Sequence, residues 1–428
     1  MYPLLELFTE FARKEGISDT AFIVGGSVRD ILMNKGIKDV DIAVKGDAIR
    51  IAELFAEKVG GTFVLLDKDF GIARVVKNNQ FIDICRMKGD TIYKDLADRD
   101  ITINAIAMPL HPSTHPPELS DPFNGRDDLR HRIIRMVSEK NLIDDPLRLL
   151  RVYRFSTMLN FAVEINTSIA VKKHAAFISK VAVERIVEEL RHILKDVSSY
   201  KTIKKMEEDG LLFHVFPEFE NIPEESLRHA LRSYGYAEHI LNNLSLYFSE
   251  GAGNIANYFK PDYRTICLKL TTLLPFDDMA EKAGIRLKMS NREIESIHTI
   301  LTNHHKIAKC MESDKTAVIG FLKKIKGDLY PVLIFNIAQH CLCELNDHPV
   351  LSFCRELLKI YHDEIIPRMN ILPLITGDDL IREFHLNPSP LFKEILDTIE
   401  LMTLQGKLHS KEEALKEIEK ILKLRSVM

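Results

Sequence analysis

The sequence has 428 residues, 46% of them hydrophobic, which is enough to build the cores of two to four globular domains. It contains no run of 18 or more apolar residues, which excludes a membrane-spanning helix. The net charge of −4 is unevenly distributed, because 17 Lys and Arg against 10 Asp and Glu lie between Arg126 and Met206. That local excess suits a phosphate-bearing partner, although a solvated helix face has the same composition.

The N-terminal segment and the cysteines together predict a cytoplasmic protein. Residues 1–16 have the apolar spacing of an amphipathic helix rather than the basic and apolar order of a signal peptide. Of the six cysteines, only Cys341 and Cys343 are close in sequence. This spacing argues against a zinc cluster or a disulfide framework and predicts buried thiols.

The first predicted strand runs into a glycine turn and a helix at residues 22–30. Gly25 and Gly26 have no Cβ, so the backbone there can approach a ligand closely. Ser27, Arg29 and the start of the helix supply donors for phosphate. An ordinary strand turn that contains glycines is the alternative interpretation.

The second predicted strand, residues 39–44, alternates acidic and apolar residues. Because side chains in a strand alternate faces, Asp39 and Asp41 point one way while Val40, Ile42 and Val44 enter the core. Two neighbouring carboxylates are costly unless a cation lies between them, and Mg²⁺ prefers one or two carboxylates plus substrate phosphates. The two stretches together predict a nucleoside triphosphate held against a metal, with a solvated Asp pair as the alternative.

A small mixed sheet with helices is predicted around this turn. The pattern indicates a helix at 47–59 and further strands at 62–66, 72–76 and 81–85. Asp83 lies on the last of these strands, where it either supplies a third carboxylate near the metals or acts as a structural cap.

A basic helix is predicted to begin at Pro146, within the basic segment. Asp145, Arg148, Arg151 and Arg154 recur every third residue and form a slowly winding band along one side of it. An amphipathic helix with a solvated basic face has the same pattern. From Ser198 onward the apolar spacing is almost entirely helical.

These stretches resemble the class II family of bacterial tRNA nucleotidyltransferases and poly(A) polymerases. The resemblance rests on Gly25-Gly-Ser-Val-Arg-Asp30 with Asp39-Val-Asp41, on Arg99-Asp-Ile-Thr-Ile-Asn-Ala105, and on Asp145-Pro-Leu-Arg-Leu-Leu-Arg-Val-Tyr-Arg154. Asp98 and Asp144 depart from it, since the family has Arg and Glu there. The resemblance implies an α+β fold: a nucleotidyltransferase head with a small mixed sheet at 1–137, a helical neck with a nucleobase-template helix at 138–200, a helical body at 201–300 and a helical, tRNA-binding tail at 301–428.

The resemblance also implies the roles of the candidate site residues. Asp39 and Asp41 would be catalytic and bind Mg²⁺, while the nucleotide would contact Gly25, Gly26, Ser27, Arg29, Arg99, Asp100, Asp145, Arg148, Arg151 and Arg154. A carboxylate followed by a guanidinium complements cytosine and adenine, whereas guanine and uracil present the opposite order of donors and acceptors. Asp145 and Arg148 are therefore expected to act as a protein template for C or A, with Arg151 and Arg154 on phosphates.

The connection between Arg86 and Asp98 bears on which nucleotides are added. It has only eleven residues, whereas family members that build the whole CCA end have a longer, flexible connection, and enzymes that add only two cytidines typically have it cut short. We therefore expect CC addition to tRNA from CTP, with a separate A-adding enzyme acting on the product. Full CCA addition with ATP, and A addition or poly(A) synthesis, are the alternatives within the family. A small-molecule nucleotidylyltransferase and a catalytically silent RNA-binding protein are the alternatives outside it.

Overall fold

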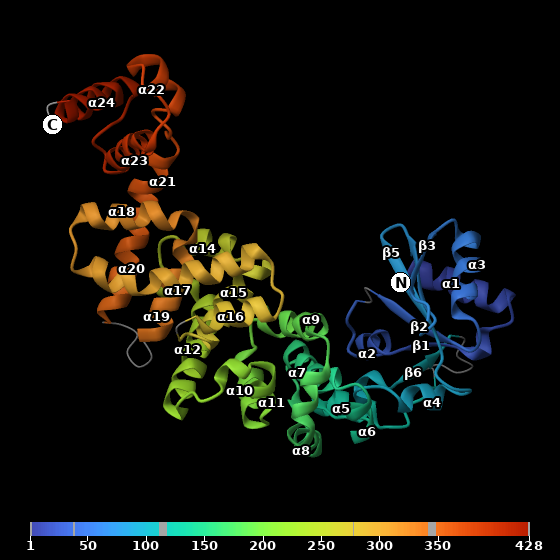
Figure 1. Ribbon diagram of the computed structural model, residues 1–428. Helices are drawn as coiled ribbons and strands as arrows, with labels where there is room; N and C mark the ends of the chain where they lie inside the picture. Colours follow the sequence, from blue (N-terminus) through green and yellow to red (C-terminus); the bar gives the residue numbers. More distant parts are fainter. Residues whose placement is uncertain (1, 37–38, 111–117, 277, 341–347, 427–428) are drawn as a thin grey trace. The chain divides into compact units, whose positions relative to one another are not determined.

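The computed structural model describes residues 2–36, 39–110, 118–276, 278–340 and 348–426 (Figure 1). The chain forms two compact units, Met1–Pro217 and Glu218–Met428. The first contains a mixed sheet with helices and the second is helical, which confirms the predicted α+β class. The finer division into head, neck, body and tail stays a prediction.

The sheet of the first unit has six strands in the order β3-β4-β5-β2-β1-β6. The strands are β1 (Ala21–Val24), β2 (Val40–Val44), β3 (Thr62–Asp67), β4 (Ile72–Lys77), β5 (Gln80–Arg86) and β6 (Ala107–Pro109). Within this sheet, among the described strands, only β2 and β5 pair in parallel, and their register sets Asp41 opposite Asp83. The sheet is mixed, as predicted, and the acidic residues of two strands meet at its centre.

One face of the sheet is covered by α1 (Pro3–Lys14) and α3 (Ala48–Val59), which lie against the strands in Figure 1. The rings of Phe8 and Phe55 meet edge to face, with centroids 5.0 Å apart, and pack on the apolar side of β2. Val40, Ile42 and Val44 are buried in this core while Asp39 is exposed, so the predicted alternation of β2 is confirmed. Asp41 is thereby directed to the opposite face of the sheet.

The other helices of the first unit connect strands of the sheet or follow it along the chain. They are α2 (Gly26–Leu32), α4 (Ile92–Ala97), α5 (Gly125–His131), α6 (Glu139–Asp144), α7 (Leu147–Leu159), α8 (Ile165–His174), α9 (Val183–Leu194), α10 (Tyr200–Glu208) and α11 (Leu211–Val215). A two-stranded parallel ladder joins β7 (Ile133–Ile134), between α5 and α6, to β8 (Ala162–Val163), between α7 and α8. The Tyr153 hydroxyl of α7 donates to Asp209 at 2.5 Å, which anchors the predicted template helix in the unit.

The second unit is built from helices throughout its described residues. Its helices are α12 (Glu224–Asn242), α13 (Leu244–Tyr247), α14 (Ala252–Tyr258), α15 (Asp262–Leu273), α16 (Met279–Arg286), α17 (Asn291–Met311), α18 (Lys315–Ile325), α19 (Leu329–His340), α20 (Pro349–Ile360), a π-helical turn (Tyr361–Ile365), α21 (Ile366–Met369), α22 (Gly377–Phe384), α23 (Pro390–Leu404) and α24 (Lys411–Ser426). Lys269 is buried there in an ion pair with Glu238 at 2.8 Å. The helical pattern predicted from Ser198 onward is confirmed.

The remaining general predictions concern membranes and cysteines. Among the described residues, no helix combines the length and apolarity needed to cross a membrane. Cys267, Cys310 and Cys354 are buried free thiols, and Cys85 is a partly buried one. The close pair Cys341 and Cys343 lies outside the described residues.

Candidate active site

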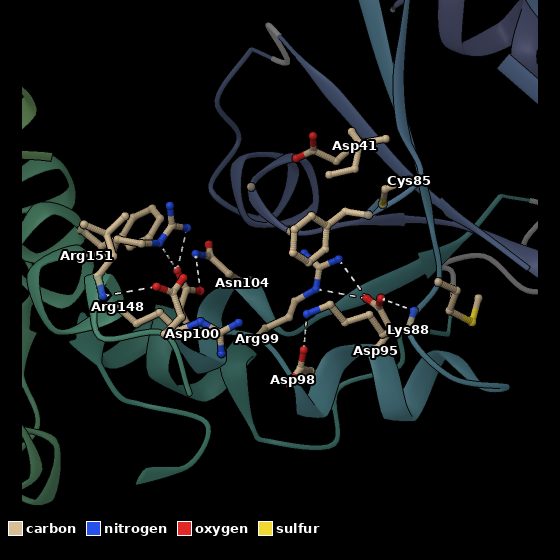
Figure 2. A pocket seen from close by; sticks show the side chains of 18 of the residues that line it. Asp41, Cys85, Lys88, Asp95, Asp98, Arg99, Asp100, Asn104, Arg148 and Arg151 are labelled. Atoms are coloured by element: carbon tan, nitrogen blue, oxygen red, sulfur yellow. Dashed lines mark hydrogen bonds and ion pairs between the residues drawn. The ribbon is translucent and has the colours of Figure 1, made fainter. Parts of the chain in front are cut away.

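A pocket of about 920 Å³ in the first unit brings the predicted site residues together (Figure 2). Its walls come from the turn before α2, from β2 and β5, from α4 and the segment after it, and from α7 and α9. It is lined by Gly25, Gly26, Arg29, Asp41, Arg99, Asp100, Asp145, Arg148, Arg151 and Arg154 among others. Ser27 and Asp39 line an adjoining pocket of about 620 Å³ that shares Asp41 with the first.

The glycine turn lies directly against charged side chains. Gly25 has a φ of +68°, and a Cβ there would lie 2.7 Å from Arg99 Nη1 and 3.5 Å from Asp41 Oδ2. A side chain at this position would be strained by the positive φ and would displace the Arg99 guanidinium. The Ser27 hydroxyl donates to the carbonyl of Asp39 at 3.1 Å and accepts from the Asp41 amide at 2.8 Å. Ser27 therefore fastens α2 to β2, and its predicted contact with phosphate stays a prediction.

Asp39 and Asp41 differ in their surroundings. Asp39 is exposed, whereas burial raises the pKa of Asp41 to about 6, with Arg99 partly offsetting the effect. Asp83 lies beside Asp41 on β5, as the metal-ligand interpretation requires. Both of its oxygens nevertheless accept from Arg74, at 2.7 and 2.8 Å, which is the arrangement of a structural ion pair.

Arg99 is held in place by an acidic residue that the sequence analysis did not single out. Asp95 is almost fully buried and accepts from Arg99 Nη2 at 2.9 Å and from the Lys88 amide at 3.0 Å. The Lys88 side chain forms an ion pair with Asp98, the residue that departs from the family pattern. The four-residue spacing of Asp95, near the end of α4, and Arg99, just after it, is the signal in the sequence that could have indicated this pair.

Asp100 connects the sheet side of the pocket to α7. It is buried and accepts from Arg151 Nε at 2.9 Å and Nη2 at 2.7 Å, and from the Asn104 amide at 3.2 Å. Burial alone would raise the pKa of Asp100, but these donors, Arg151 above all, hold it below its ordinary value. The contact with the nucleotide sugar that the resemblance implies stays a prediction, since the carboxylate here binds protein donors.

Three arginines surround the ring of Phe155. The guanidinium carbons of Arg29, Arg151 and Arg154 lie 5.5, 5.4 and 4.2 Å from its centroid. The buried carboxylate of Glu189, on α9, lies 2.7 Å from Arg154 and 3.5 Å from Arg151. Burial and the charge of Arg151 still lower the pKa of Arg154. An anion bound here would relieve that cost, which suits the predicted phosphate contacts.

The two predicted template residues line the pocket at the start of α7. The Arg148 guanidinium makes one weak contact, 3.4 Å from the carbonyl of Asn141, and is otherwise directed to the pocket. Asp145 accepts from Arg185 Nη2 at 3.0 Å. Arg185, on α9, is not among the predicted site residues, and it also lines the pocket.

The one thiol that lines this pocket is in no state to act as a nucleophile. Cys85 donates to the carbonyl of Ile42, and burial raises the pKa of its thiol to about 12. It is therefore protonated at neutral pH, and direct transfer without a covalent enzyme intermediate is the chemistry that the pocket suits.

Comparisons with known proteins agree with this geometry. Residues 21–135 match the poly A polymerase head domain, and residues 160–222 match a domain described as the probable RNA and SrmB-binding site of polymerase A. A CC-adding tRNA nucleotidyltransferase of Synechocystis sp. is 32% identical over 92% of both chains, and an A-adding enzyme of Halalkalibacterium halodurans is 28% identical over 96% of this chain and 90% of that one. A CCA-adding enzyme of Leuconostoc mesenteroides is 27% identical over 94% and 92%.

Solved structures resemble the whole chain in fold. A CCA-adding enzyme in complex with ATP superposes with a TM-score of 0.74 at 24% identity, covering 98% of this chain and 95% of that one. The CCA-adding enzyme of Thermotoga maritima in complex with tRNA gives a TM-score of 0.71 at 24% identity, with the same coverage. On these matches, above all the Synechocystis relative, the chain is an enzyme that belongs to the family of tRNA nucleotidyltransferases and poly(A) polymerases.

Proposed function

We propose that this enzyme adds two cytidines from CTP to the 3′ end of tRNA and leaves the terminal A to a separate A-adding enzyme. The proposed specificity for CC addition rests on the connection between β5 and α4, residues 87–91, which is short and is held by a hydrogen bond and an ion pair. The backbone of Lys88 donates to Asp95 and its side chain pairs with Asp98. A connection held at its first residues in this way has little freedom to reshape the pocket for ATP.

The relatives support tRNA end addition but include CC-adding, A-adding and CCA-adding enzymes. Full CCA addition is therefore the second candidate. We also propose that the enzyme acts in the cytoplasm, and that the helices of residues 301–428 hold the elbow of tRNA, as the resemblance implies.

Asp39 and Asp41 have the properties expected of ligands for the divalent metal ions that such enzymes generally use. Asp41 lies on β2, Asp39 directly precedes that strand, and both line the same pocket. The raised pKa of Asp41 indicates a buried carboxyl that a bound cation would hold ionised. No group of three ligating side chains occurs among the described residues. Two carboxylates are enough for Mg²⁺, since substrate phosphates complete its coordination. When bound, Mg²⁺ would activate the 3′ hydroxyl of the RNA and stabilise the leaving diphosphate.

The residues of the chain would supply positioning and charge around that chemistry. Gly25 keeps the backbone of the turn close to the Arg99 guanidinium, and Arg99 and Arg154 line the pocket as cations that would neutralise the charge of the triphosphate. Asp145 would accept from the exocyclic amine of cytosine while Arg148 donates to its acceptors. Correct placement of the two reacting groups would supply much of the rate.

Primer extension on a tRNA that lacks its CCA end tests this proposal. The assay contains Mg²⁺ with CTP alone, ATP alone or both, and Asp41→Asn serves as the inactive control. We expect extension to stop after two cytidines even when ATP is present, and EDTA to abolish it. A terminal A would show a full CCA-adding enzyme. Absence of any extension, together with failure to bind tRNA in a gel shift, would favour a small-molecule nucleotidylyltransferase.

A further inference from the structure

An exposed aromatic side chain lines the catalytic pocket. Phe70 lies in the β3–β4 turn (residues 68–71), is 61% exposed and lines the same pocket as Asp41. Exposed apolar residues that are scattered singly need no explanation. This one differs because it stands at the edge of the pocket in which the reaction is proposed to occur.

The β3–β4 turn holds Phe70 in a defined place. The Asp67 carboxylate accepts from the amides of Asp69 and Phe70 at 2.9 and 3.0 Å. From the neighbouring strand, Arg86 donates to the carbonyl of Asp69 at 3.0 Å. Gly71 has a φ of +65°, and a Cβ there would lie 3.0 Å from that of Arg86. The aromatic ring is therefore presented on a braced backbone, which reduces the entropic cost of binding a ligand.

The layout of the pocket indicates which ligand would meet Phe70. Figure 2 shows Arg148 on one side of Arg99, and Cys85 and Lys88 on the other. The β3–β4 turn borders the side of Cys85, which pairs with Ile72 in the sheet. A new phosphodiester bond joins two nucleosides that lie on either side of the transferred phosphate. If the incoming base occupies the Arg148 side, the terminal nucleoside of the RNA takes the side of Phe70.

The charges near the turn suit the backbone of an RNA end. Lys45, Lys68 and Arg86 line a pocket of about 520 Å³ that adjoins the catalytic one. Its acidic members are Asp47 and Asp90, and the former is occupied as the N-cap of α3. Proteins bind single-stranded RNA by stacking bases on aromatic rings while cations follow the phosphates.

We propose that Phe70 stacks on the 3′-terminal base of the RNA to which the nucleotide is added. This inference rests on the proposed tRNA end addition and names the binding surface of the acceptor strand. The RNA end would thereby be held with its 3′ hydroxyl toward Asp41, while Lys68 and Arg86 contact the phosphates before it. Phe70 would act on the acceptor and not on CTP.

A double-mutant cycle between the enzyme and its RNA tests this contact. Wild type and Phe70→Ala are each assayed for C addition to two full-length tRNAs that lack CCA, one natural and one with an abasic 3′-terminal nucleotide. Stacking on one base is worth roughly 5- to 100-fold. We expect the kcat/KM of wild type for tRNA to be lower by this factor on the abasic RNA than on the natural RNA. On the natural RNA, Phe70→Ala should be lower than wild type by the same factor. Phe70→Ala should extend the two RNAs with values of kcat/KM that agree within about twofold.

Two further variants complete the design. Phe70→Trp keeps an aromatic face and should restore the preference for the natural RNA. Leu66→Ala removes another exposed apolar side chain, 46% exposed and outside the lining of the pocket, and should behave as wild type. Three results would overturn the assignment. Phe70→Ala and the abasic nucleotide could lower kcat/KM independently, so that their losses multiply when combined. Phe70→Ala could instead change only the KM for CTP, or it could have no effect. Failure of wild type to extend either RNA would instead refute the proposed function.

Discussion

Asp145 and Asp144 are adjacent carboxylates of which only one lines the pocket, so they provide a matched test of the protein template. Asp145→Asn replaces an acceptor oxygen with an amide donor. This donor would face another donor in the exocyclic amine of cytosine, whereas it could donate to O4 of uracil. Asp145 is one-third exposed and pairs with Arg185, while Asp144 is about half exposed and pairs with Lys140 on the surface of α6. Both substitutions should change stability by less than about 1 kcal/mol, because both break exposed ion pairs.

The expected effect is therefore on the choice of base. One well-placed contact with a base edge discriminates by about 1–3 kcal/mol, so Asp145→Asn should lower the ratio of kcat/KM for CTP to that for UTP by about 10- to 100-fold. Asp144→Asn should change it by less than about twofold. The measurement is single-nucleotide extension of a tRNA that lacks CCA, with each triphosphate in turn. An unchanged ratio in Asp145→Asn, or an equal fall in Asp144→Asn, would show that this carboxylate does not read the base.

Two further predictions use matched pairs in the first unit. Gly25→Ala should lower the rate of C addition at least about tenfold, because the new methyl group would displace Arg99. Gly16→Ala is also at positive φ but has open space around it, and it should leave the rate unchanged. Equal rates of the two variants in primer extension would show that the contact between Gly25 and Arg99 does not matter for the reaction. Glu189→Gln breaks the buried ion pair with Arg154 and should lower the free energy of unfolding of this unit by about 3 kcal/mol in urea titrations. The control Glu188→Gln changes an exposed side chain and should lower it by about 0.5 kcal/mol or less. Similar losses in the two variants would show that the charge of Glu189 is not needed for stability.

Much of the head could be predicted because its signals are local. The alternation in β2 and the glycine pair before α2 are each contained in a few residues, and the structure has the strand and helix where they were expected. The same holds for α7, which begins at Leu147, one residue after the start predicted from Pro146. Short-range sterics and hydrophobic periodicity decide such elements.

The partners of the site residues could not be predicted because they come from distant parts of the chain. Arg185 reaches Asp145 across 40 residues, and Arg151 reaches Asp100 across 51. Periodicity indicates that α9 is amphipathic but not which neighbour its buried face meets, so Glu189 had no signal beyond its place in a helix. Likewise, the ion pair of Arg74 with Asp83 depends on the pairing of β4 with β5, which composition alone does not specify.

The ion pair between Asp100 and Arg151 has a consequence for fidelity. It couples the helix that is proposed to read the base to the segment that carries Arg99, and Asn104 extends the coupling to Arg29 beside the glycine turn. We expect a helix held by these contacts to resist the tilt that would accommodate a mismatched base while the triphosphate stays in place. A wrong base would then misplace the reacting phosphate, so that it lowers the rate of nucleotidyl transfer as well as the affinity for the triphosphate.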